Sequence, residues 1–140
     1  MTGFSELRVN CLACPQAARP IRHAVAAFLG AAGYADGDIS DNILMAVGEA
    51  LANAVEHAYN GVESNAVELF ARVEHDHTLT VDVFDRGKFI KRTAPLAGRG
   101  FGMRIVEAIA DAVTVNVDDG THVRMIFKLP VNADRKGIAS

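Results

Sequence analysis

Residues 46–59, AVGEALANAVEHAY, constrain the fold and chemistry of this chain more than any other stretch. Their pattern predicts a helix that is apolar on one side and carries Glu49 and Asn53 on the other. Side chains four residues apart project from the same side of a helix, one turn above the other. A carboxylate beside an amide suits a general base next to a Mg²⁺ ligand, because Mg²⁺ accepts oxygen ligands. The alternative interpretation is an ordinary solvated helix face.

A second candidate motif is formed by Asp85, Arg86 and Gly87, which follow a predicted strand. A carboxylate that accepts a hydrogen bond from an exocyclic amine can select adenine, and a glycine lets a flat ring approach the backbone. The alternative is an Asp that caps a turn. Gly120 and Thr121 precede the last predicted strand, where a turn is the default and a hydroxyl near a purine is the alternative.

A glycine-rich stretch precedes the third predicted helix, with Gly98, Gly100 and Gly102 alternating. Backbone N–H groups at a helix N-terminus can cradle phosphate, and Arg99 adds a cation. The spacing is not the GxGxxG of a dinucleotide-binding fold, and the lysine of a P-loop is missing. The alternative is a glycine hinge that binds no ligand.

Hydrophobic periodicity predicts an α+β two-layer sandwich, with a mixed, mostly antiparallel sheet and helices packed on one face. Strands adjacent in the sequence favour hairpins. The predicted strands are 4–12, 67–73, 79–84, 113–117 and 123–129, and the predicted helices are 15–32, 38–59 and 100–112. Residues 88–97 are polar and irregular. We expect one domain over residues 1–130, followed by a polar tail, 131–140.

The composition limits the class of protein. Half of the residues are hydrophobic and the net charge is −3, which favours a soluble globular protein and argues against a nucleic-acid binder. No apolar run approaches the roughly 20 residues that span a bilayer, so we expect no membrane association and a cytoplasmic location. Cys11 and Cys14 form a CxxC without a second ligand pair, so we interpret them as ordinary buried or reduced thiols, and the alternative is redox or metal use.

In this order the motifs resemble the ATP-binding domain shared by DNA gyrase, Hsp90-type chaperones and histidine kinases, the Bergerat-type fold. Within that superfamily the chain is most similar to the RsbW-type anti-sigma-factor serine kinases. The resemblance rests on an N-box at 49–59, an Asp-x-Gly box at 85–87, a glycine box at 98–106 and the Gly-Thr pair at 120–121.

The resemblance implies a role for each matching residue. Glu49 becomes the general base and Asn53 the Mg²⁺ ligand, and His57 is given a role near the nucleotide. ATP-binding residues elsewhere in the chain include the adenine-selecting Asp85, its neighbour Gly87, the supporting Thr121 and the phosphate-covering segment Gly98, Arg99, Gly100, Phe101, Gly102 and Met103.

The resemblance also implies a partner switch that uses ATP and Mg²⁺. The protein would sequester a sigma factor and phosphorylate a serine of a STAS-domain anti-anti-sigma protein, and it would form a homodimer. Glu49 favours transfer to a serine hydroxyl, or ATP hydrolysis, over histidine phosphorylation. The chain departs from the pattern at Phe89, where many relatives have glycine, and in its short 88–97 segment. These departures leave open a non-catalytic, nucleotide-gated binding module that holds its partners without phosphorylating them.

Overall fold

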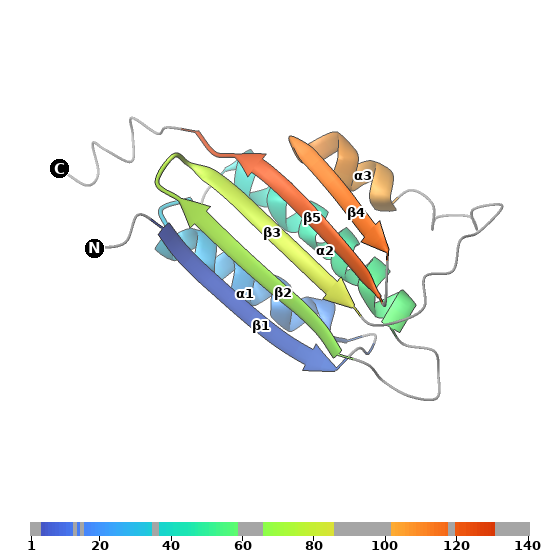
Figure 1. Ribbon diagram of the computed structural model, residues 1–140. Helices are drawn as coiled ribbons and strands as arrows, with labels where there is room; N and C mark the ends of the chain where they lie inside the picture. Colours follow the sequence, from blue (N-terminus) through green and yellow to red (C-terminus); the bar gives the residue numbers. More distant parts are fainter. Residues whose placement is uncertain are drawn as a thin grey trace.

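The computed structural model describes residues 4–12, 14, 16–34, 37–58, 66–85, 102–117 and 120–130. Within these residues, five strands form one layer and three helices form a second layer behind it (Figure 1). The elements are β1 Phe4–Leu12, α1 Ala18–Ala31, α2 Asp38–Ala58, β2 Ala66–Glu74, β3 Thr78–Asp85, α3 Gly102–Ile109, β4 Ala112–Val117 and β5 Thr121–Lys128. The predicted two-layer α+β sandwich is confirmed.

The strands are hydrogen-bonded in the order β1-β2-β3-β5-β4, and all four pairs among these described strands are antiparallel. The mostly antiparallel sheet is therefore as predicted, but its expected mixed character is not found in the described strands. Between β1 and β2 the chain runs back along the sheet in α1 and forward again in α2. Strand β2 therefore starts at the end of the sheet where β1 stops, and it runs antiparallel to β1 (Figure 1). Strands β3 and β4 run in the same direction, but β5 lies between them and pairs antiparallel with both, so β3 and β4 do not pair with each other.

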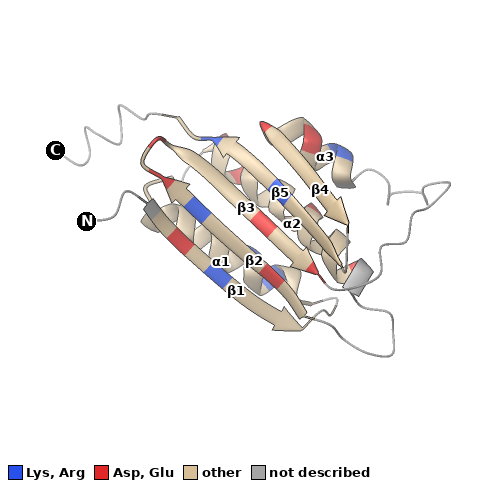
Figure 2. Ribbon diagram, viewed as in Figure 1, with Lys and Arg blue, Asp and Glu red and all other residues tan. Residues whose placement is uncertain are grey.

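The core fills the space between the sheet and the helices. Strand β2 alternates between buried and partly exposed residues, as a strand with one covered face does. Ile21, Val25 and Leu29 form the buried stripe of α1, and Ile43, Val47 and Leu51 belong to that of α2. None of the described helices covers the opposite face of the sheet, and Figure 2 shows acidic and basic residues interspersed along it.

The end of α1 agrees with the sequence pattern. Gly33 has a φ of 96°, the left-handed conformation that glycine adopts without strain. The N–H groups of Gly33 and Tyr34 donate to the carbonyls of Gly30 and Leu29. These bonds end α1.

The third helix is shorter than predicted. It ends at Ile109, whereas the sequence pattern extends it to Ala112, and Ala112 begins β4. The backbone N–H of Asp111 donates to the carbonyl of Ile126 at 2.8 Å, and its side-chain Oδ2 accepts from the N–H of Lys128 at 2.6 Å. These bonds to β5 draw the chain into the sheet, overriding the helix propensity of the alanines.

No helix in the described ranges combines the length and apolarity that a membrane crossing requires. The single domain over residues 1–130 stays a prediction, and the 131–140 tail lies outside the described residues.

Core packing of α2 can be tested with two leucine substitutions. Leu51 is fully buried, whereas Leu12 is 66% exposed. We expect Leu51→Ala to lower the free energy of unfolding by about 2–5 kcal/mol, because it leaves a cavity, and Leu12→Ala to change it by less than about 0.5 kcal/mol. Urea denaturation measures both values, and equal losses would contradict the described core.

Candidate functional site

Glu49 and Asn53 lie on α2, at the border between its buried stripe and solvent. Both side chains are half-buried, and the residues that directly follow them, Ala50 and Ala54, are in the core. One helix spans both positions, as the sequence predicts. The carboxylate and the amide therefore stand one turn apart, held by the core but open to solvent.

A groove of about 490 Å³ opens between α1 and α2 beside Glu49. Charged residues of both signs line it, with Arg22 from α1 and Asp41 and Glu49 from α2; the remaining lining residues are Ala18, Leu44, Met45, Gly48 and Ala52. A second hollow of about 500 Å³ shares Ala18, Arg22 and Leu44 with it and adds Arg19 and His23. Asn53 does not line this groove, so of the Glu49–Asn53 pair only Glu49 contacts it.

Gly48 explains how Arg22 reaches the groove. A Cβ atom at position 48 would lie 3.1 Å from Cδ of Arg22, closer than most side chains tolerate. The absence of a side chain at Gly48 thus lets the side chain of Arg22 lie against α2, next to Glu49. Sequence reasoning missed Arg22; the available signal was a glycine, poor for helix stability, in an alanine-rich helix immediately before the predicted base.

The second half of the site lies where β3 ends and β5 begins. Asp85 and Thr121 are paired directly across the two strands and form the last rung of their ladder. Both are buried, with 5% and 3% exposure, although both are polar. Their side chains share the covered face of the sheet with Val83 and Val123.

Thr121 carries an unsatisfied polar atom. Its Oγ1 is buried and makes no hydrogen bond within the described structure. A buried hydroxyl without a partner costs stability, so native proteins rarely keep one without a use. A hydroxyl beside a buried carboxylate fits an adenine ring, which offers both a donor amine and acceptor nitrogens.

Figure 1 shows how the two halves of the site are related. The C-terminal end of α2 lies at the same end of the sheet as the end of β3 and the beginning of β5. Asn53 is one turn closer to that end than Glu49. The fold therefore arranges Glu49, Asn53 and the Asp85–Thr121 rung along one direction.

The remaining predicted site residues are described only in part. His57 belongs to α2 and Gly102 begins α3, but the structure does not describe the side chain of His57. Met103 is half-buried and packs against the core. The predicted roles of Gly87, Gly98, Arg99, Gly100 and Phe101 lie outside the described residues, as do Phe89 and the 88–97 segment.

Comparison with known proteins identifies the family. The model of the histidine kinase-like ATPase domain matches residues 11–127. The serine-protein kinase RsbW of Oceanobacillus iheyensis is 28% identical over 140 aligned residues, covering 89% of this chain and 87% of the relative. The anti-sigma F factor of Clostridium beijerinckii is 27% identical over 122 residues, covering 79% of this chain and 84% of the relative.

Solved structures agree with this assignment. The RsbU and RsbW domains of a Mycobacterium tuberculosis protein match with a TM-score of 0.70 and 26% identity over 89% of this chain, which spans 32% of that longer chain. A blue-light activated histidine kinase domain from Erythrobacter litoralis, at 22% identity and a TM-score of 0.58 over 88% of this chain and 65% of that one, shows the fold alone.

The chain therefore belongs to the histidine kinase-like ATPase family. Within that family it is of the RsbW kinase type, as the sequence motifs predict.

The two cysteines are separate from this site. Cys11 and Cys14 are free, half-buried and packed against the core. Burial raises the pKa of the Cys11 thiol, and the charge of Cys14 raises it further. In the described part of the chain, no three His, Cys, Asp or Glu side chains form a cluster that could hold a metal. A half-buried thiol with a raised pKa is typical of an unreactive structural cysteine.

The raised pKa of Cys11 has a measurable consequence. A higher pKa leaves less thiolate at neutral pH, and the thiolate is the species that reacts. We expect iodoacetamide to modify Cys11 more slowly in the folded protein than in urea at the same pH. Peptide mass spectrometry locates the modification, and faster modification in the folded state would point to an activated cysteine.

The unsatisfied hydroxyl predicts an unusual stability effect. Thr121→Val keeps the side-chain shape and removes the buried polar atom, so we expect the free energy of unfolding without ligand to rise by about 1–2 kcal/mol. Thr114→Val, at an exposed position of β4, serves as the matched control and should change it by less than about 0.5 kcal/mol. A loss of stability in Thr121→Val would mean that the hydroxyl is satisfied in solution.

Proposed function

We propose that this RsbW-type protein transfers the γ-phosphoryl group of Mg-ATP to a serine of a small STAS-domain antagonist and sequesters a sigma factor. The two names carried by its relatives, serine-protein kinase RsbW and anti-sigma F factor, support the two halves of this proposal. In such a partner switch, phosphorylation of the antagonist weakens its complex through added charge and leaves the sigma factor bound. A cytoplasmic homodimer is part of the same proposal.

Recognition of the nucleotide is assigned to Asp85 and Thr121. The buried carboxylate of Asp85 would accept from the exocyclic amine of adenine, and the Thr121 hydroxyl would gain the partner that it lacks. This pairing favours ATP over GTP, because guanine presents a carbonyl where adenine presents its amine. The unsatisfied hydroxyl is the observation that carries the nucleotide assignment.

The Mg²⁺ ligand is assigned to Asn53. Mg²⁺ commonly keeps several waters and uses few protein ligands together with substrate phosphates, so one amide oxygen suffices on the protein side. When bound, the ion would neutralise charge on the phosphates. Asn53 suits this role because it is half-exposed and one turn from the proposed base.

Glu49 is assigned the role of general base. Its carboxylate lines the groove between α1 and α2, so a serine entering that groove from a partner protein could deliver its hydroxyl proton to Glu49. Arg22 lines the same groove and would attract acidic groups on that partner. A groove open to solvent is required here because the acceptor is a side chain of another protein.

The kinase assignment is tested with Glu49→Gln. A general base typically contributes about 10²- to 10⁴-fold, so we expect phosphotransfer to fall by at least about 100-fold while ATP affinity stays within about twofold. γ-labelled ATP and Mg²⁺ are added to a lysate of the source cell with each purified variant, and acid-stable label on a small protein is measured. Glu56→Gln, exposed on the same helix, serves as the control.

Two outcomes would redirect the assignment. Full transfer by Glu49→Gln would exclude Glu49 as the base. ATP binding without transfer by the wild-type protein would favour the nucleotide-gated binding module instead.

A further inference from the structure

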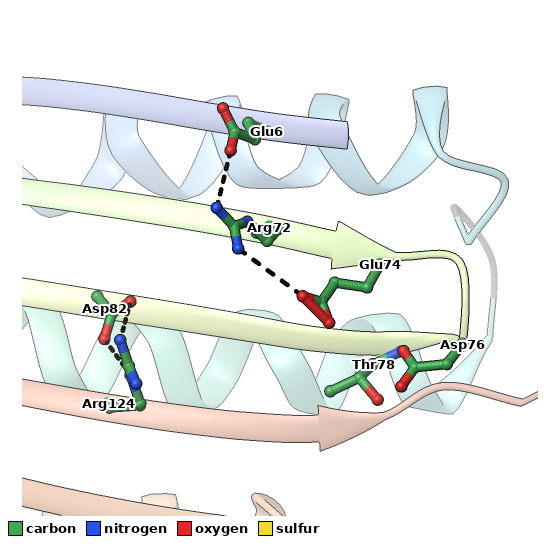
Figure 3. Close-up of polar contacts among 7 residues, drawn as sticks. All are labelled: Glu6, Arg72, Glu74, Asp76, Thr78, Asp82 and Arg124. Carbon is green, nitrogen blue, oxygen red and sulfur yellow. Dashed lines mark hydrogen bonds and ion pairs between the residues drawn. The ribbon is translucent and has the colours of Figure 1, made fainter. Parts of the chain in front are cut away.

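A polar cluster lies on the open face of the sheet, opposite the helices, and contains a buried charge. Asp82 points away from the helix layer, yet it is only 3% exposed. Its Oδ1 accepts from Nε2 of His122 at 2.6 Å and from Nε of Arg124 at 2.8 Å. Figure 3 shows the carboxylate facing Arg124 across β3 and β5. We refer to Asp82, Phe84, His122 and Arg124 as the open-face cluster.

His122 is tied to β3 by two contacts. Its ring stacks on that of Phe84, with centroids 4.2 Å apart and planes inclined by 16°. Phe84 and His122 are also directly opposite in the strand ladder, whereas Asp82 is two residues further along β3. The ring stack therefore holds His122 against Phe84, its direct cross-strand neighbour, and the hydrogen bond holds it against Asp82, its diagonal neighbour.

The open-face cluster lies back to back with the proposed adenine site. Phe84 precedes Asp85 and His122 follows Thr121, so the Phe84–His122 pair is the rung next to the Asp85–Thr121 rung. Because side chains alternate between faces, the ring stack lies on the open face and the polar rung on the covered face. The polar rung is the last of its ladder, and strand ends open most easily unless neighbouring contacts hold them.

We propose that His122 is a positioning residue of the nucleotide site, holding the terminal rung so that Asp85 and Thr121 keep a fixed separation. The inference rests on the proposed adenine-binding role of that rung. A hydrogen-bonding site of this kind discriminates between bases only when its donors and acceptors are correctly spaced. Motion of the rung would therefore weaken ATP binding and its preference over GTP together.

His122 can be replaced without leaving a charge unpaired. Arg124 still bonds to Asp82 when the imidazole is removed, and the hydrogen bond and charge of Asp82 raise the pKa of the guanidinium, so this cation remains as a partner of the carboxylate. We therefore expect His122→Ala to fold. Two further variants separate the contacts, because His122→Phe keeps a ring for the stack and His122→Gln keeps a donor for Asp82.

The control lies on the same face of the sheet. Glu6 pairs with Arg72 at 3.2 Å across β1 and β2, and both side chains are about 40% exposed (Figure 3). Glu6→Gln removes the charge from one partner of this cross-strand ion pair on the open face and leaves β3 and β5 unchanged. This variant shows how far nucleotide binding changes when an ion pair is altered elsewhere on the open face.

The experiment measures dissociation constants for Mg-ATP and Mg-GTP by calorimetry. We expect His122→Ala to weaken ATP binding about tenfold, or about 1.4 kcal/mol, and to leave GTP binding within about twofold. His122→Phe and His122→Gln should give intermediate ATP affinities, and Glu6→Gln should match the wild type. Amide hydrogen exchange should be faster in His122→Ala for the peptides that contain Asp85 and Thr121.

The outcomes separate this inference from the proposed function. An unchanged ATP-to-GTP ratio in His122→Ala, with a wild-type protein that prefers ATP, would overturn the positioning role alone. This holds also when both affinities fall by the same factor, because equal weakening indicates general destabilisation. If His122→Ala does not fold, the ratios for His122→Phe and His122→Gln decide in the same way. A wild-type protein that binds no ATP would overturn the proposed function and this inference with it.

Discussion

The placement of Glu49 and Asn53 depends on the packing of α2 against the sheet. The helix buries a continuous apolar stripe that includes Val47 and Leu51, and this contact fixes its rotation about its own axis. Once the stripe is buried, Glu49 and Asn53 have to emerge at its border. A rotation by one residue position would bury the carboxylate or move it away from the groove. Burial of apolar surface thus sets the direction of the polar groups.

The two faces of the sheet carry different sets of polar residues. Alternation along β3 and β5 places Asp85 and Thr121 toward the helices and Asp82 and His122 toward the open side. The same two strands therefore supply a polar pair for a ligand and, on the reverse, contacts that hold the strands together. A carboxylate nearly inaccessible to water on an otherwise solvated face is stable only because charged and polar donors surround it.

The sequence allows prediction of the elements whose residues act locally. The helix predicted around residues 46–59, the turn at Gly33 and the β2–β3 hairpin follow from periodicity and turn residues, and the structure confirms the turn, the hairpin and the helix as far as Ala58. The end of α3 could not be predicted, because the bond from Asp111 to Ile126 depends on β5 being in place. Nor could the contacts of Arg22 with α2 or of His122 with Asp82, which join distant parts of the chain. Motif resemblance singled out Thr121, but only the structure shows its unsatisfied hydroxyl.

The pairing of β1 has a consequence for how the chain folds as it is synthesised. Phe4 pairs with Glu74 and Leu12 with Ala66, so β1, which is synthesised before the other strands of this sheet, has to wait for the two helices and then for β2. The hairpins β2–β3 and β4–β5 need only short loops, and contacts between residues close in sequence form faster than distant ones. Until β2 emerges, the apolar side of β1, with Leu7 and Val9, has no sheet partner. That interval is when the nascent chain is most exposed to mispairing.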